Sequence, residues 1–458
     1  MNNLTDTRNY SEVTDEIISL SSLMEENSRI PVELYREMNV KRGLRDLDGT
    51  GVLAGLTNIS EVKAKQIING EAVPCDGELY YRGVNVKDIS TACLREERHG
   101  FEEVVYLLLF GALPDEKQLS DFKNLLGSYR SLPPSFVRDV IMKAPSSDMM
   151  NALSRSVLTL YSYDEDPDNT SLPNVLRQCL QLISMFPLLT VYGYHAYDHY
   201  YNGNSLFIHS PLPGASTSEN ILHLLRPDSS YTALEAAVLD IALILHAEHG
   251  GGNNSTFTTR VVSSSGTDTY SAIAAALGSL KGPKHGGANI KVVKMFEDIK
   301  KNIRDWNDDE EIADYLRRLL NKEAFDRSGL IYGVGHAVYS VSDPRALVFR
   351  GFVEKLAAEK GREDEFNLYA QVERIAPMVI GEHRKIYKGV SVNVDFYSGF
   401  AYDMLNLPSE LYTPIFAVAR VAGWSAHRLE ELLGNSKIIR PAYKEITPVR
   451  AYVPLSER

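Results

Sequence analysis

Residues 231–249 read YTALEAAVLDIALILHAEH, and this stretch decides the fold class. Its apolar residues recur at steps of four, three and four, which is one face of an α-helix: Leu234, Val238, Ile241 and Leu245. Thr232 and Glu235 have the spacing of a capping box at the start of that helix. The stretch therefore predicts a long helix that buries one face and ends close to two histidines.

The same periodicity recurs along the chain and predicts further helices, at residues 101–110, 175–186, 271–280, 290–303, 310–320 and 412–433. Strand-like runs are few and early, at residues 51–59 and 78–82. We therefore expect a mainly α fold with a minor β element near the N-terminus. Two glycine-rich turns are expected near Gly286 and Gly399, and they are interpreted either as hinges or as simple helix ends.

Composition excludes several classes of protein. The 458 residues are enough for a large core and two or three domains, and the net charge of −12 argues against a general nucleic-acid surface. The three cysteines form no CxxC pair, which favours free thiols in a reducing compartment. We see neither a secretory signal nor an apolar run near the roughly 20 residues that span a bilayer. A cytoplasmic enzyme is expected.

The first candidate cluster is HAEHGGGNN at residues 246–254. It places His246 and His249 three residues apart on one helix face, near the C-terminal end of the expected helix. A metal site would need further ligands, and the HExxH order of a metalloprotease is absent. An anion site and a plain helix end followed by glycine remain the alternatives.

Two further histidines lie in glycine-rich segments. His285 lies in GPKHGGAN, residues 282–289, before a predicted helix whose N-terminus would favour a neutral imidazole that can donate a hydrogen bond. His336 lies in GVGHAVY, residues 333–339, and Arg345 follows in an Asp-Pro-Arg sequence. Arg345 has the chemistry to clamp a carboxylate with two hydrogen bonds. Ordinary turns are the alternative for both segments.

The last candidates are charged residues in apolar surroundings. Asp395 in NVDFYSG, residues 393–399, would be partly desolvated and suited to act as a base, or it would cap the next helix. Arg420 lies in a mostly apolar helix, so it must meet a carboxylate of the protein or of a ligand. Arg440 follows in the sequence IIRP.

Together these segments resemble the citrate synthase family from the GVLAGLTNI segment at residues 51–59 to IIRP at residues 438–441. The densest motifs are HAEH, SSGTDTYSAIAAALGSLKGPKHGGAN, GVGHAVYSVSDPRA, VNVDFYSG and ARVAGW. Five motifs in the family's order make the resemblance specific. It implies a helical fold in which a large domain, residues 1–285 and 399–458, is closed by a small domain, residues 286–398.

The resemblance also implies a role for each candidate. Asp395 matches the base that removes a proton from acetyl-CoA, His285 the donor that stabilises the enolate, and His336 the group that polarises the oxaloacetate ketone. Further positions match groups that bind the oxaloacetate and citrate carboxylates: His249, Arg345 and Arg420. Arg440 matches an arginine that reaches the neighbouring subunit's site, so the expected active unit is a homodimer.

The implied reaction joins acetyl-CoA to oxaloacetate and hydrolyses citryl-CoA, with no metal and no cofactor beyond the CoA substrate. The alternatives are a 2-methylcitrate synthase that uses propionyl-CoA and a non-catalytic binding protein of the same fold. Asn393 matches a residue near the CoA chain. The chain departs from the family at Gly250, Ala337 and residues 339–341, which places the CoA phosphate contacts in doubt. Lys388, Lys385 and Arg45 are candidate substitutes.

Overall fold

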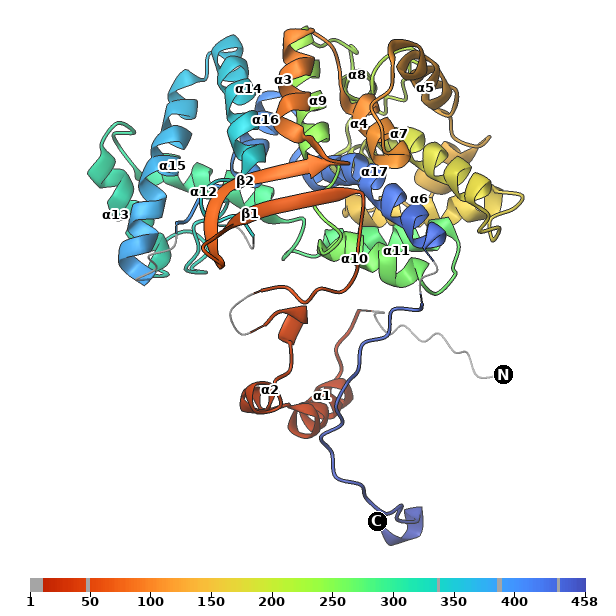
Figure 1. Cartoon of the computed structure of the whole chain (residues 1–458), viewed down its shortest axis with the longest axis vertical. Coiled ribbons are helices and arrows are strands. Elements are labelled where there is room, and N and C mark those ends of the chain that lie inside the picture. The colour runs from red at the N-terminus through yellow and green to blue at the C-terminus, as the bar shows by residue number, and fades with distance from the viewer. Residues whose placement is uncertain (1–10, 47–49, 336–337, 385–388, 435–436) are drawn as a thin grey trace. The chain divides into compact units, whose positions relative to one another are not determined.

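The structure is a computed structural model (Figure 1). It describes residues 11–46, 50–335, 338–384, 389–434 and 437–458. The contacts separate two units, Met1–Leu56 and Thr57–Arg458. The first unit contains α1 (Asp15–Ser28), α2 (Val32–Glu37) and a 3₁₀ turn (Arg42–Leu44).

The second unit contains the other helices, which confirm the mainly α fold. These are α3 (Val86–Arg95), α4 (Phe101–Phe110), α5 (Glu116–Ser128), α6 (Met149–Leu160), α7 (Leu172–Asn202), α8 (Thr217–Leu225), α9 (Ala233–His246), α10 (Asn254–Ser263), α11 (Thr269–Lys281), α12 (Ala288–Asn302), α13 (Asp309–Leu320), α14 (Pro344–Lys360), α15 (Glu363–Arg384), α16 (Val394–Met404) and α17 (Tyr412–Leu433). Single helical turns lie at Val137–Ile141, Tyr161–Tyr163, Ser409–Leu411 and Leu455–Glu457. The predicted bounds of α4 and α17 are confirmed.

The β element is a hairpin of β1 (Ser60–Ile68) and β2 (Glu71–Tyr81), which are antiparallel, extended by the short β3 (Val84–Asn85). Residues 78–81 do fall at the end of β2, with Arg82 just beyond it, but the strand expected at residues 51–59 is wrong. Within the described chain, only Gly51 of that segment takes part in a β-bridge. Among the described residues, 51–59 have no neighbouring strand with which their backbone could form the hydrogen bonds of a β-sheet. In the second unit, β2 packs against α3, α4 and α14.

Helix α9 begins as predicted. The Thr232 hydroxyl accepts a bond of 3.1 Å from the Glu235 N–H, and the Glu235 carboxylate accepts one of 2.8 Å from the Thr232 N–H. The helix ends at His246, and the left-handed backbone of Gly250, at φ 88°, turns the chain away. His249 therefore lies outside the helix, and the expectation that both histidines share one helix face is wrong.

The expected turn at Gly399 is also wrong, because Gly399 lies inside α16. A Cβ at this position would overlap the side chain of Val293 and lie 3.0 Å from the Asn289 carbonyl oxygen, both on α12. The glycine serves close packing between two helices rather than a bend. Figure 1 shows α12 to α16 gathered on one side of the second unit. Their division as a separate closing domain, residues 286–398, stays a prediction.

Helices α7 and α17 pack against each other in the core. Helix α7 continues through Pro187, well beyond the predicted residues 175–186. Among the described helices, it alone is long and apolar enough to cross a membrane by length and composition. However, 78% of its most apolar stretch is buried inside the protein, as in a core helix. Helix α17 is buried over most of its length and carries Arg420 into the interior.

Candidate active site

Arg420 is the centre of the site. Its side chain is 0% exposed, and its Nε donates to the His246 carbonyl oxygen at 2.6 Å. Its Nη1 and Nη2 are buried and have no hydrogen-bond partner in the described part of the chain. The guanidinium lies 4.6 Å from the ring centre of Phe416. A buried cation without an ion-pair partner is costly, so the two Nη groups are suited to a carboxylate ligand.

His285 lies in the turn before α12, as predicted, with Nε2 at 3.0 Å from the Ser255 hydroxyl. Trp424 donates from Nε1 to the same hydroxyl at 3.1 Å, which fixes the position of Ser255. Burial, together with the charge of Arg420, lowers the pKa of His285 to about 4. The ring is therefore neutral at physiological pH, as predicted, and burial and the charge of Arg420 both favour this form.

Asp395 is the second residue of α16. The cap of this helix is Asn393, whose side-chain oxygen accepts a bond of 3.0 Å from the Asp395 N–H. The alternative that Asp395 itself caps the helix is therefore wrong. Burial raises the pKa of Asp395 to about 6, against the opposing effect of Arg345 and Arg420. A carboxylate of raised basicity suits proton removal.

Arg345 is 4% exposed and is held by Asp343 through two hydrogen bonds, of 3.1 Å from Nε and 2.8 Å from Nη2. Asp343 also caps α14 by accepting from the Arg345 N–H at 3.0 Å. The carboxylate that Arg345 binds through Nε and Nη2 is therefore that of Asp343, a residue of the protein itself. Sequence reasoning missed Asp343, although its place before Pro344 at a helix start was the available signal.

The two histidines of the HAEH segment have different surroundings. His246 is 1% exposed and lies edge-on to Phe416, with ring centres 4.6 Å apart. Burial, with Arg345 and Arg420 nearby, lowers the pKa of His246 well below its usual value. His249 lies edge-on to Tyr339, with ring centres 5.5 Å apart. Among the described residues no three His, Cys, Asp or Glu side chains converge to hold a metal. A metal site at His246 and His249 therefore finds no third ligand among them.

Electrostatic interactions show which predicted residues lie together. The charge of Arg420 acts on His285 and on Asp395, and Arg345 acts on Asp395 as well. Arg345 also lies 5.9 Å from the ring centre of Tyr339, which contacts His249. The structure therefore brings the C-terminal end of α9 and the beginnings of α12, α14 and α16 to the middle of α17.

The structure does not place the remaining predicted residues beside Arg420. His336 and Lys388, as well as Lys385, lie outside the described residues. Arg440 and Arg45 are described, and both are exposed. Their expected roles toward a second subunit and toward CoA stay predictions.

The glycines that precede His336 are tied to the helix of Asp395. The Asn393 N–H donates to the Gly333 carbonyl oxygen, and the Asn393 side-chain amide donates to that of Gly335, each at 2.9 Å. Gly333 and Gly335 both have positive φ, at 78° and 96°. Asn393 thus joins two of the predicted segments, a structural role that the sequence did not indicate.

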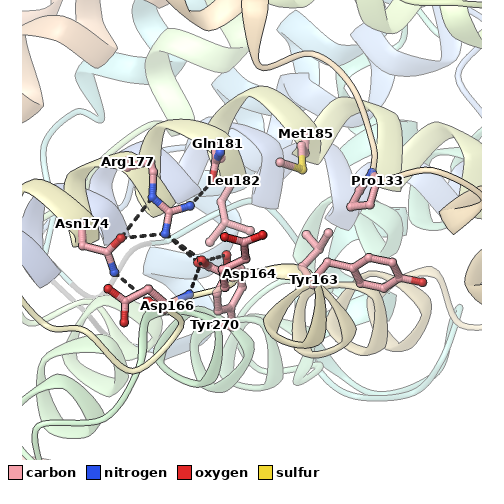
Figure 2. Close-up of a pocket in the computed structure, with 12 residues that line it drawn as sticks. Pro133, Tyr163, Asp164, Asp166, Asn174, Arg177, Gln181, Leu182, Met185 and Tyr270 are labelled. Carbon is pink, nitrogen blue, oxygen red and sulfur yellow. Dashed lines mark hydrogen bonds and ion pairs between the residues drawn. The ribbon is translucent and has the colours of Figure 1, made fainter.

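The protein has a further cavity that is lined by none of the predicted site residues. Figure 2 shows it lined by Asp164, Arg177, Tyr270 and neighbours, none of which is a predicted site residue. Arg177 and Tyr270 each reach the Asp164 carboxylate at 2.8 Å. Asp164, Arg177 and Tyr270 therefore satisfy one another in the wall of this cavity.

The chain is similar to known proteins over most of its length. The family described as "Citrate synthase, C-terminal domain" matches residues 46–442. Citrate synthase of Synechocystis sp. is 34% identical over 84% of this chain and 89% of its own length. 2-Methylcitrate synthase of Shewanella oneidensis is 33% identical over 83% of this chain and 92% of its own length.

A solved structure agrees with the fold. Citrate synthase of Thermoplasma acidophilum, in a ternary complex with carboxymethyl coenzyme A and oxaloacetate, superposes with a TM-score of 0.73. It is 26% identical, and the match covers 92% of this chain and 99% of that one.

Proposed function

The chain belongs to the citrate synthase family, and we propose that it condenses acetyl-CoA with oxaloacetate and hydrolyses the resulting citryl-CoA to citrate and CoA. One observation carries the proposal: Arg420 presents two buried, unpartnered Nη groups, among the described residues, beside Asp395 and His285. A carboxylate receptor next to a basic carboxylate and a neutral imidazole is what this reaction needs.

The chemistry explains why these groups belong together. The α-proton of a thioester is weakly acidic, so a carboxylate base needs a hydrogen-bond donor where the enolate charge develops. Asp395 has the raised pKa of such a base, and His285 is the neutral donor. His336 is assigned to the ketone of oxaloacetate by its place in the family motif. Proton removal, enolate stabilisation and activation of the ketone are then carried by three different side chains.

A second acyl substrate is the specific rival. The matching relatives include both a citrate synthase and a 2-methylcitrate synthase at nearly equal identity, 34% and 33%. One additional methylene changes discrimination by only about 1–3 kcal/mol. The test is kcat/KM for acetyl-CoA against propionyl-CoA, with thiol release as the readout. We expect a preference for acetyl-CoA, and a clear preference for propionyl-CoA would assign the chain to the rival activity.

The proposal also includes the enzyme class, the cellular compartment, the oligomeric state and the cofactor requirement. The enzyme is an acyltransferase of the tricarboxylic acid cycle that acts in the cytoplasm as a homodimer, with Arg440 completing the partner's site. It requires no metal and no cofactor. If the wild type bound oxaloacetate but released no thiol from acetyl-CoA, the chain would be a binding protein of the same fold. If Asp395→Gly left thiol release unchanged, the proposed role of Asp395 as the base would fail.

A further inference from the structure

Glu248 is a buried carboxylate that the proposed reaction leaves without a role. It is 0% exposed and lies between His246 and His249, just after α9. Its Oε1 accepts three hydrogen bonds: from the Ser60 hydroxyl at 2.9 Å, the Gly250 N–H at 2.7 Å and His427 Nε2 at 2.9 Å. Three donors on one oxygen identify the ionised form.

The protonation of His427 follows from its other partner. Two N–H groups of Arg260 point at His427 Nδ1, from Nε at 3.1 Å and from Nη2 at 2.7 Å. A guanidinium has donors only, so Nδ1 must accept, and the hydrogen of the ring is on Nε2. His427 therefore donates to Glu248. Arg260 itself is held by ion pairs with Glu430 and Glu431 on α17.

This network sits against the backbone that positions Arg420. The Arg420 Nε is bonded to the carbonyl oxygen of His246, two residues before Glu248. The Tyr81 hydroxyl donates to the carbonyl oxygens of Ile244 and Glu248, at 2.9 and 3.1 Å. A Cβ at Gly423 would overlap the Glu248 carboxylate and the Ala247 carbonyl oxygen, so α17 approaches this segment as closely as a glycine allows.

Glu248 is also the nearby negative charge that Arg420 needs. The two side chains form no ion pair within the described residues, yet Glu248 is the strongest influence that favours the charged form of Arg420. Arg420 therefore has a negative charge nearby, while neither of its Nη groups is used in a hydrogen bond within the described residues. Arg345 differs, because its countercharge, Asp343, takes two of its donors directly.

We propose that Glu248, held by His427 and Ser60, is a positioning residue of the dicarboxylate site. It fixes the segment of His246 to Gly250 and balances Arg420 while leaving both Nη groups for a substrate carboxylate. This deepens the proposed function, on which the choice of oxaloacetate as ligand rests. The opposite outcome is physically reasonable, since a bare negative charge near the site would repel the substrate and its removal would tighten binding.

The test compares Glu248→Gln with the wild type in the full-length protein. We expect the KM and the calorimetric Kd for oxaloacetate to rise about tenfold or more, because an amide cannot accept three hydrogen bonds on one oxygen or carry the countercharge. The KM for acetyl-CoA should stay within about twofold. Glu235→Gln is the matched control: Glu235 is a buried carboxylate on α9 that pairs with Arg226 and Lys360. It should lower the melting temperature without changing oxaloacetate binding.

A second pair of variants keeps the test decisive if Glu248→Gln does not fold. His427→Gln retains a side-chain N–H for Glu248 and should stay within about threefold of the wild-type Kd. His427→Phe keeps the bulk without the donor and should reproduce the loss expected of Glu248→Gln. Unchanged or tighter oxaloacetate binding in Glu248→Gln or in His427→Phe would overturn the proposal, as would equal losses for both substrates.

Calorimetry separates this proposal from the proposed function. A wild-type protein that binds oxaloacetate but releases no thiol from acyl-CoA would refute the condensation activity, while the Kd comparison would still decide the role of Glu248. A wild-type protein that does not bind oxaloacetate would overturn both.

Discussion

Two titrating side chains determine the pH range in which the site can work. In the proposed reaction Asp395 must be ionised to accept a proton, and burial raises its pKa to about 6. His285 must be neutral, and its pKa of about 4 keeps it so above that value. We therefore predict that kcat/KM for acetyl-CoA falls about tenfold per pH unit below pH 6. A profile that is flat to pH 5 would contradict the role of Asp395 as the base.

The same carboxylate should reduce the stability of the folded protein above about pH 6. Because the folded-state pKa of Asp395 lies above its unfolded value, the wild type is favoured at low pH and loses stability as the pH rises through 6. Asp395→Asn should then be inactive, yet more stable by about 1–3 kcal/mol at pH 8. Its advantage over the wild type should disappear near pH 4. Denaturant unfolding of both proteins at the two pH values measures this.

Two buried arginines on α17 have different roles. Arg428 is satisfied by Thr269, Ser263 and the Thr267 carbonyl oxygen, whereas the two Nη groups of Arg420 lack partners in the described structure. Arg420→Lys removes the planar fork and should raise the KM for oxaloacetate about 10–100-fold with little loss of melting temperature. Arg428→Lys should do the reverse. Equal effects on oxaloacetate KM would mean that Arg420 is only a structural residue.

At the scale of elements, Asn393 links the start of α16 to the segment before His336. Asn393→Ala removes the cap and the amide donor, and should cost about 1 kcal/mol of stability as well as most of kcat. Asn393→Ser keeps a capping oxygen, but its side chain is shorter than the amide and should not reach the Gly335 carbonyl oxygen. It should retain the melting temperature and still lose kcat. Full activity in Asn393→Ser would show that the amide donor does not position the catalytic segment.

The sequence predicted helices well where their ends carry local signals. The capping box of Thr232 and Glu235 is confirmed, because a cap depends on residues three apart. Gly399 was misinterpreted because a glycine that bends the chain and one that admits a neighbouring helix look alike in sequence. The contact of Glu248 with His427 joins residues 179 positions apart, so no local pattern could have indicated it.

At the scale of the whole molecule, the contacts between the candidate site residues could not be predicted from local sequence patterns. The residues were found as separate motifs, but their relations were not: Asp343 holds Arg345, and Arg420 acts on both Asp395 and His285. These relations arise because α9 packs against α17, α14 and α16 pack against α9, and α12 packs against α16. Chemistry could be inferred from residue types, whereas the electrostatics required the packing of helices distant in sequence.

Arg440 is exposed, and its predicted role belongs to a second copy of the chain. Asp395→Asn and Arg440→Leu should each give an inactive homodimer if one chain supplies the base and the other the arginine. After the two are unfolded and refolded together, half of the dimers should be mixed, each with one site carrying both defects and one site intact. About a quarter of wild-type activity should therefore return. Failure of activity to return in mixed dimers that sedimentation shows to have formed would place Arg440 in its own chain's site.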